Sequence, residues 1–500
     1  MELKEAIAKY KEGNRLMHAY SHAMGVMYYD FETHAPKKAI KGFSETMGAL
    51  SEITYKLSVN EERFALLDFL TEHAAELDEI TRLEVEEEQK GLKLLRSISV
   101  EEFVEYRQLT SEATAVWHEA KVKSDYELFK PYLKRLYETS IKLAKAAEPD
   151  MDPYDYWLNE HEEGFTQDVL DGYFMLIKEE LIPFIRRIGE LPKPDDGFIY
   201  KKYPIWQQRE FSDEVMAIMG IDPENCTLSE TEHPFTTGFN KLDSRITTHY
   251  HEDFLTANMY SVIHEGGHAT YEMNVGDELW GSPLAAGASS GMHESQSRFY
   301  ENIIGRSMAF ANVIFPVMKK RWPEQLDGVT VGDFFRAVNK AEPSLIRTEA
   351  DELTYSLHIL IRYEMEKKLM HGELSFDDVP AEWNRLYKEY LGIDVPSDRE
   401  GCLQDTHWAG GMIGYFPSYS LGSAYGAQIL ASMKKEMDID KLVSEGRISE
   451  ITAWLVDHIY KYGRIKKPAE LLRICCGEDF DPKYYIDYLK TKFGKVYGIE

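Results

Sequence analysis

Apolar residues recur every three or four positions over long stretches of the N-terminal third of the chain, which is rich in Leu, Ala, Glu and Lys. This spacing gathers the apolar side chains on one face of an α-helix. The helices predicted in this way are residues 3–25, 61–95, 100–147 and 167–189. We therefore expect the N-terminal third to be helical.

The pattern changes between residues 191 and 250, where prolines interrupt the helical spacing and β-branched residues gather at 246–248. A small β-sheet is expected here. Helical spacing then returns, and the later predicted helices are residues 298–320, 346–370, 379–391 and 419–437. The whole pattern predicts an all-α, mainly helical fold with one small β-sheet.

The motif HEGGH, at residues 264–268, lies inside a further predicted helix that directly follows the expected sheet. Side chains four positions apart share one helix face, so His264 and His268 can bind one metal ion while Glu265 reaches a water on that metal. The two glycines of the motif cost the helix about 1 kcal/mol each relative to alanine. We therefore expect another segment to approach the helix closely at this point.

A third metal ligand is expected elsewhere, because a catalytic zinc ion takes three protein ligands and keeps a fourth position for water. Glu294 is the predicted ligand. It lies at the opening of a helix that follows a Gly- and Ser-rich loop over residues 281–291. His293 is the alternative, but a histidine at the start of a helix is more often a cap or a surface residue.

Further segments accompany the metal motif along the chain, in the order HPF at 233–235, DSRIT at 243–247, HESQSR at 293–298, IRTEAD at 346–351 and GCLQDTHW at 401–408. With these segments the chain resembles the thermostable (Taq-type) zinc metallocarboxypeptidases, over most of its length. The resemblance implies a homodimer and a long, narrow active-site groove with the HExxH helix at its floor.

Arg347 is the candidate for binding the C-terminal carboxylate of a substrate, because a guanidinium offers two parallel N–H donors to a carboxylate. A helical arginine more often forms a salt bridge, for which Glu349 or Asp351 would serve, but the resemblance favours substrate binding. It also implies that His233 and Arg245 bind substrate. For Arg245, a structural ion pair with Asp243 is favoured over a catalytic role.

The Gly- and aromatic-rich segment 401–422 predicts a shaped loop. A peptidase needs a donor for the oxyanion that develops on the scissile carbonyl, and His407 with Tyr415 or Tyr419 can supply one. We favour Tyr419 as the catalytic donor, from its resemblance to the His-loop-Tyr arrangement of related zinc oligopeptidases. Tyr415 is then assigned to substrate binding.

An acidic group is expected to orient each metal-binding imidazole, and Asp351 and Glu272 are the candidates. In several other HExxH peptidases this acid stands four residues after the glutamate ligand. That position is Arg298 here, so the orienting group must lie elsewhere.

The composition fits one large folded unit: 500 residues with 43% hydrophobic content can bury a sizeable core, and no linker-like stretch divides the chain. We expect a single peptidase domain, residues 1–500, with an N-terminal helical part of about 1–190 and a catalytic part of about 191–500. The net charge of -29 argues against nucleic acid and anionic membranes as partners. Four cysteines without a disulfide or metal spacing, and the lack of a signal peptide, predict a cytoplasmic protein.

These features predict a metal-dependent carboxypeptidase of broad specificity, in which Glu265 is the general base and Zn²⁺, or alternatively Co²⁺, is the cofactor. An extended peptide pairing with an exposed strand edge of the sheet would be bound independently of its side chains. Two alternatives remain: a zinc endo-oligopeptidase of similar helical fold, and a non-catalytic, metal-containing peptide-binding protein.

Overall fold

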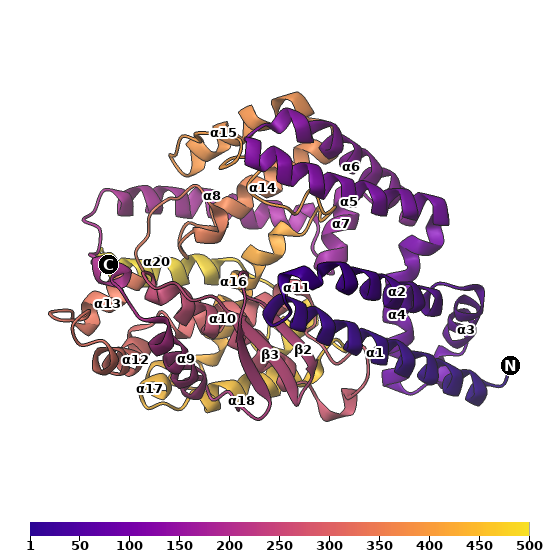
Figure 1. The fold of residues 1–500 in the computed structure, drawn as a ribbon, viewed down its shortest axis with the longest axis horizontal. Coiled ribbons are helices and arrows are strands. Elements are labelled where there is room, and N and C mark those ends of the chain that lie inside the picture. The colour runs from indigo at the N-terminus through magenta and orange to yellow at the C-terminus, as the bar shows by residue number, and fades with distance from the viewer. Residues whose placement is uncertain (500) are drawn as a thin grey trace.

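The computed structural model describes residues 1–499, and helices make up 68% of the chain (Figure 1). Its helices are α1 (Leu3–Thr33), α2 (Ile40–Ser58), α3 (Glu61–Glu72), α4 (Glu79–Ser97), α5 (Val100–Lys123), α6 (Tyr126–Ala147), α7 (Pro153–His161), α8 (Gln167–Gly189), α9 (Ile205–Met219), α10 (Leu255–Met273), α11 (Ser290–Arg298), α12 (Met308–Arg321), α13 (Val331–Val338), α14 (Tyr355–Met370), α15 (Val379–Tyr390), α16 (Phe416–Met433), α17 (Ile439–Ser444), α18 (Ile448–His458), α19 (Pro468–Cys476) and α20 (Lys483–Tyr497). The strands are β1 (Cys226–Glu230), β2 (Thr236–Asn240) and β3 (Asp243–Thr248). The predicted fold class, all-α with one small sheet, is confirmed.

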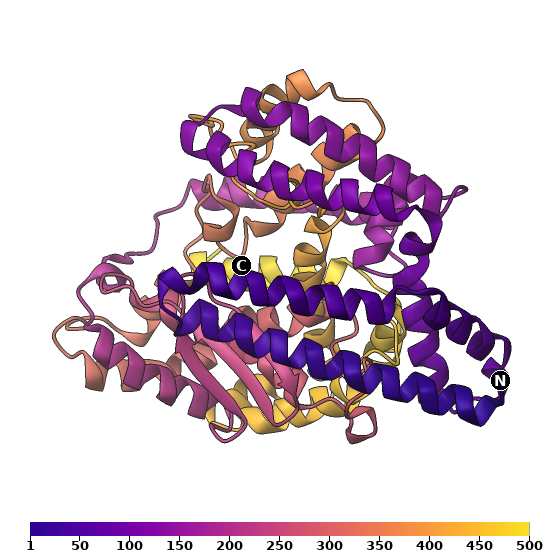
Figure 2. The same ribbon diagram turned by 45° about the vertical axis from the view of Figure 1, so that its right-hand side comes forward.

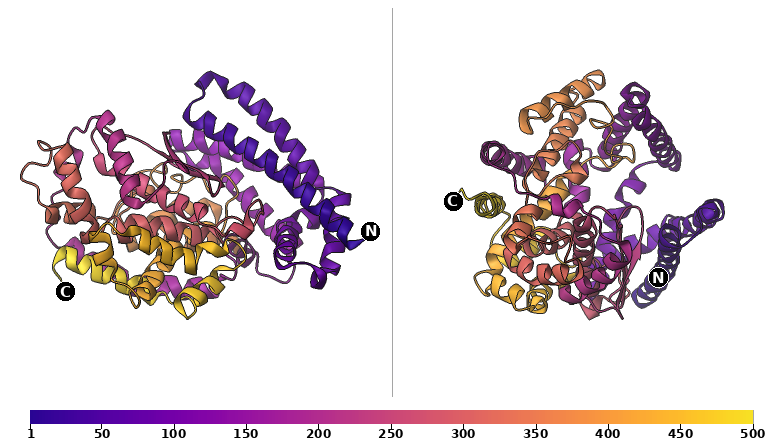
Figure 3. Two further views of the ribbon diagram at one scale, coloured as in Figure 1. Left: turned by 90° about the horizontal axis from the view of Figure 1, so that it is seen from below. Right: turned by 60° about the vertical axis from the view of Figure 1, so that its left-hand side comes forward.

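The N-terminal helices α1 to α4 form a lobe with its own small core. Figure 3 shows α1 and α2 as a long antiparallel pair beside the main body. The core of this lobe consists of Ala6, Tyr10, Leu66, Leu67, Leu70, Val85 and Leu92. The predicted helix 61–95 is interrupted, because the side chain of Asp78 accepts the backbone N–H of Thr81 and starts α4.

The second long prediction, residues 100–147, also splits into two helices. Ser124 adopts a left-handed conformation, with φ of 53°, between α5 and α6. Asp125 then caps α6 by accepting the backbone N–H of Glu127. The apolar spacing continues across this turn, so the spacing alone did not reveal the break.

The main hydrophobic core runs from Leu109 in α5 to Phe493 in α20 and joins both halves of the chain. In Figure 1, α5 to α8 lie beside α14 and α15, far away in the sequence. Among the helices of the described residues, none is both long and apolar enough to cross a membrane.

The sheet has the order β1-β3-β2, with β1 parallel and β2 antiparallel to the central strand β3. Both β2 and β3 contact α10, which follows them in the chain. Figure 2 shows α1 and α2 passing in front of the sheet. The prediction of a small sheet next to the metal-motif helix is therefore confirmed.

Two of the later predicted helices begin well after their expected starts. Residues 299–304 form a π-helix and α12 begins only at Met308, where Ser307 accepts the backbone N–H of Phe310. The helix predicted from residue 346 begins at Tyr355, so Arg347 lies in a short 3-10 turn, Arg347–Glu349. α16 begins at Phe416, three residues before the prediction, with a proline in its first turn.

Candidate metal centre and active site

The HEGGH motif lies in α10, where neighbouring segments approach the helix very closely. A Cβ atom on Gly267 would lie 2.8 Å from the Cα atom of Ser297 in α11. One on Gly266 would lie 2.7 Å from the side chain of Ile221. The close approach expected from the two glycines is confirmed, and it brings α11 alongside the two histidines.

His264, His268 and Glu294 form the cluster in this structure that is suited to a metal ion. The Oε2 atom of Glu294 lies 3.7 Å from Nε2 of His264 and 3.6 Å from Nε2 of His268. One ligand atom from each residue lies within 4.8 Å of the others. Two imidazoles and one carboxylate are a donor set that suits a divalent transition metal and leaves a position open.

Electrostatics keep Glu294 in its anionic, metal-binding form. Burial favours the protonated acid, but the positive charge of Arg298 and the nearby His264 hold the pKa of Glu294 well below its ordinary value. Arg298 Nε donates to Glu294 Oε1 at 2.7 Å. The residue four positions after Glu294 therefore supports the carboxylate rather than an imidazole.

Glu301 orients the first histidine. Nδ1 of His264 lies 2.9 Å from Oε2 of Glu301, which leaves Nε2 free to face the metal position. Glu301 lies in the π-helix Phe299–Ile304, and π-helical turns often occur at functional sites. Asp351, one of the two predicted orienting acids, instead binds Thr354 and the backbone N–H of Glu342, so that prediction was wrong.

A second histidine orients the other ligand. Nδ1 of His293 lies 2.5 Å from Nδ1 of His268, and Nε2 of His293 lies 2.6 Å from Oε1 of Glu272. Proton donation from His268 to His293, and from His293 to Glu272, leaves Nε2 of His268 free for a metal. Glu272 thus acts as predicted, but through His293, which is not a member of the ligand cluster.

The start of α11 is held in place by a buried acid, Glu162. Its carboxylate accepts the backbone N–H of Gly291 at 2.8 Å and the hydroxyl protons of Ser289 and Tyr425. Burial raises the pKa of Glu162 to about 7. These bonds fix the helix that carries Glu294.

Glu265 lies next to the cluster, and its carboxylate is held by the sheet. The hydroxyl of Thr236 in β2 donates to Oε2 of Glu265 at 2.6 Å. Glu265 is buried, with 7% of its surface exposed. A carboxylate fixed beside a metal position can accept a proton from an attacking water.

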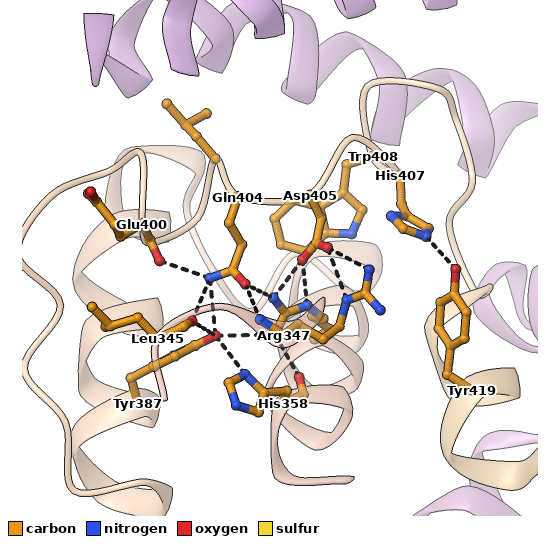
Figure 4. A network of polar contacts seen from close by, with 12 residues as sticks. Leu345, Arg347, His358, Tyr387, Glu400, Gln404, Asp405, His407, Trp408 and Tyr419 are labelled. Carbon is orange, nitrogen blue, oxygen red and sulfur yellow. Dashed lines mark hydrogen bonds and ion pairs between the residues drawn. The ribbon is translucent and has the colours of Figure 1, made fainter. Parts of the chain in front are cut away.

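Arg347 is buried in a network of polar contacts (Figure 4), in which it shares the carboxylate of Asp405 with a second arginine. An Nη atom of Arg347 lies 2.9 Å from Asp405, and Arg362 binds the other oxygen of the same carboxylate. Arg347 also donates to the hydroxyl of Tyr355 at 3.2 Å. The salt bridge to Glu349 or Asp351 considered from the sequence is replaced by one to Asp405.

His407 and Tyr419 lie together beside this network (Figure 4). Nε2 of His407 is 3.1 Å from the hydroxyl oxygen of Tyr419, and the ring of Tyr419 lies 4.9 Å from the guanidinium of Arg347. Burial lowers the pKa of His407 to about 4, so the ring is neutral near pH 7. Burial and the charge of Glu294 both raise the pKa of Tyr415, whose ring centroid is 5.2 Å from that of Tyr419.

Comparison with known proteins identifies the family. The profile of the carboxypeptidase Taq (M32) metallopeptidase family matches residues 9–493. The chain belongs to this family. It is a metallocarboxypeptidase, a metal-dependent hydrolase of peptide bonds.

Relatives of similar length and fold support this assignment. The chain is 41% identical to Carboxypeptidase 1 of Bacillus subtilis (strain 168), over 97% of each protein, and 34% identical to Thermostable carboxypeptidase 1 of Pyrococcus furiosus, over 98% of each. The M32 carboxypeptidase of Deinococcus radiodurans R1 superimposes with a TM-score of 0.95 at 31% identity, covering 99% of this chain and 100% of that one. The carboxypeptidase fold is therefore shared over 99% of the chain.

Two predicted substrate-binding residues of this M32 carboxypeptidase lie on or near the sheet. His233 is exposed in the loop between β1 and β2. Arg245, on β3, forms the ion pair with Asp243 that we favoured from the sequence, at 2.9 Å, and lies over the ring of Phe239. In the part of the chain that the structure describes, neither belongs to the ligand cluster, and their roles in substrate binding stay predictions.

The residues with a place in the site that the sequence analysis missed include Glu301, Thr236 and Asp405. Glu301 stands seven positions after Glu294, which is two helical turns and the same face, so the spacing held a usable signal. Thr236 directly follows the HPF segment, and Asp405 lies in the segment 401–408. No spacing rule links these last two to their partners, because both contacts join distant parts of the chain.

We expect Thr236→Val to lower kcat about tenfold while metal content stays unchanged. The substitution keeps a β-branched side chain but removes the donor to Glu265, and a hydrogen bond to a charged group contributes about 1.5–3 kcal/mol. Thr236→Ser, which keeps the hydroxyl, should retain most of the activity. Steady-state kinetics of both variants on one N-blocked peptide test this, and equal losses in both would contradict it.

Proposed function

We propose that this enzyme releases single residues from the C-termini of peptides, with Zn²⁺ bound by His264, His268 and Glu294. The observation that carries the proposal is the position of a buried guanidinium, Arg347, beside an arrangement of metal ligands and a general base. Arg347 would bind the C-terminal carboxylate of the substrate, and the metal ligands together with the general base would hydrolyse the peptide bond. Both parts are needed for a carboxypeptidase.

Glu265 acts as the general base. A bound divalent ion supplies Lewis-acid chemistry, because it polarises a carbonyl group and lowers the pKa of water. Glu265 accepts the proton of the attacking water and passes it to the leaving amine. The hydrogen bond from Thr236 keeps the carboxylate in place for both transfers.

Tyr419 is the proposed donor to the developing oxyanion. A neutral His407 that donates its Nε2 proton to the oxygen of Tyr419 turns the hydroxyl proton of Tyr419 toward the substrate. Such a donor stabilises charge that appears only in the transition state. Tyr415, next to Tyr419, is proposed to contact the substrate.

The charge balance around Arg347 supports its role in binding the chain end. Arg347 and Arg362 share the single carboxylate of Asp405, and 6% of Arg347 and 0% of Arg362 are exposed. An isolated buried positive charge is costly. A substrate carboxylate that pairs with Arg347 neutralises the cluster, and the bidentate geometry of the guanidinium fixes the position of the scissile bond.

Broad specificity is proposed to come from the edge of the sheet. β2 is an edge strand, and within residues 1–499 its backbone hydrogen bonds run to β3. An extended peptide that pairs with this edge is bound through its backbone, whatever its side chains are. The peptide then lies in a groove over α10.

Removal of the metal is expected to abolish hydrolysis, and Zn²⁺ or Co²⁺ to restore it. Two neutral imidazoles and one carboxylate bind these ions well but reversibly. The test is activity on an N-blocked peptide after chelation, with metal content measured by mass spectrometry, followed by back-titration with each ion. Full activity in verified metal-free protein would exclude the proposed mechanism.

We also propose that the protein is a single peptidase domain that forms a homodimer in the cytoplasm. The core that joins α5 to α20 supports one domain. All four cysteines are free and buried, as is usual in a reducing compartment. Light scattering after size-exclusion chromatography tests the dimer, and a mass of 57.8 kDa would contradict it.

A further inference from the structure

A cavity of about 270 Å³ lies beside the ligand cluster, between the end of β2, the end of α10 and the loop before α11. Glu272 forms part of its wall. Because His293 joins Glu272 to His268, the cavity begins about one helical turn from a metal ligand. None of the catalytic steps described above uses this space.

The cavity and Arg347 lie on opposite sides of the ligand cluster. α11 runs antiparallel to α10, since His268 contacts His293 at one end of the pair and His264 contacts Glu301 at the other. The cavity is at the His268 end.

Arg347 is reached from the other end. The guanidinium of Arg298, which supports Glu294, lies 4.4 Å from the ring of Tyr355, and the hydroxyl of Tyr355 accepts from Arg347. A peptide whose terminal carboxylate is at Arg347 and whose scissile bond is at the metal therefore points its upstream residues toward the cavity.

β2 links the catalytic centre to this cavity. The strand begins at Thr236, which binds Glu265, and its end, Gly238–Asn240, lines the cavity. At about 3.3 Å per residue, this stretch begins about 7 Å from Thr236 and ends about 13 Å from it. A peptide that runs from the cavity to Arg347 is antiparallel to β2 and brings its third to fifth residues upstream of the scissile bond to the cavity.

The walls of the cavity suit an apolar side chain. Its lining includes Val275, Pro283, Ala286 and Trp280, and Trp280 is 55% exposed.

The charged groups in the wall already have partners, since Glu272 pairs with His293 and Lys241 with Asp277. Gly238 adds no side chain, and a Cβ atom there would lie 3.1 Å from Glu272.

We propose that this cavity is a specificity subsite that binds an apolar, preferably aromatic, side chain from the third to fifth residue upstream of the scissile bond. The inference rests on the proposed carboxypeptidase function. It adds selectivity for upstream sequence to an enzyme that otherwise binds the substrate backbone. Short peptides that do not reach the cavity gain nothing from it.

The test uses N-acetylated hexapeptides with a single Phe or Gly at each of the three upstream positions. For the wild type we expect kcat/KM to be about tenfold higher for Phe than for Gly at one position or more, as is typical for filling an apolar pocket. Ala286→Trp, which fills the cavity, and Trp280→Ala, which removes one wall, should both lose most of this ratio. The control Trp206→Ala removes another exposed tryptophan, 61% exposed on α9, and should keep it.

The ratio within each variant cancels any general loss of activity. Equal kcat/KM for Phe and Gly at all three positions, or an unchanged ratio in both cavity variants, would overturn the subsite. Calorimetric binding of the same peptides to metal-loaded Glu265→Gln separates the two proposals, because it needs no turnover. If the wild type cleaves nothing, tighter binding of Phe peptides still supports the subsite, and equal Kd values overturn it.

Discussion

Glu265→Gln is expected to lower kcat by about 100-fold to 10,000-fold, the contribution typical of a general base. The glutamine amide has nearly the same shape and can still accept the hydrogen bond from Thr236, but it cannot take a proton from water. Metal binding should not change, because Glu265 is not one of the three clustered ligands. The measurement is kcat on an N-blocked peptide together with metal content.

Glu294→Gln is the informative comparison for this variant. It replaces the predicted third ligand, so it should weaken metal binding, whereas Glu278→Gln changes an exposed carboxylate just after α10 and should alter neither property. Wild-type turnover in Glu265→Gln would remove Glu265 from the general-base role. Unchanged metal affinity in Glu294→Gln would show that the third ligand lies elsewhere.

Arg347→Ala is expected to lower kcat/KM on free-acid peptides. The lost transition-state stabilisation should be about 2–5 kcal/mol, the loss expected when one partner of a buried charge pair is removed. On C-amidated forms of the same peptides the effect should be small. The protein should still fold, because Asp405 keeps its ion pair with Arg362. The measurement is a comparison of wild type and variant on acid and amide forms, with products identified by mass.

Two further variants sharpen this test. Arg347→Lys should recover only part of the loss, since an ammonium group cannot form two parallel hydrogen bonds. Arg321→Ala removes an ion-paired guanidinium on α12, outside the site, and should leave both substrates unaffected. Equal losses on acid and amide peptides would remove Arg347 from the carboxylate role, and internal cleavage by the wild type would favour an endo-oligopeptidase.

The positions of several helix ends could not be predicted from apolar spacing. The spacing continues through Ser124 and through residues 73–78, where local hydrogen bonds and one left-handed residue break the helices. The same holds for residues 299–307, where a π-helix and a new cap replace a regular helix. Capping and turn geometry depend on single polar residues, to which a periodic pattern is insensitive.

The sequence by itself determined the fold class, the small sheet, and the motif that places two histidines and a glutamate on one helix. These features depend on spacings within a few turns, where the backbone geometry is fixed. Only the tertiary structure decided which groups pair with the side chains of the site. These partners are Glu301 and His293 for the imidazoles, Thr236 for Glu265, and Asp405 for Arg347. Most of these partners come from different elements, and packing of the whole chain is what brings them within hydrogen-bond distance.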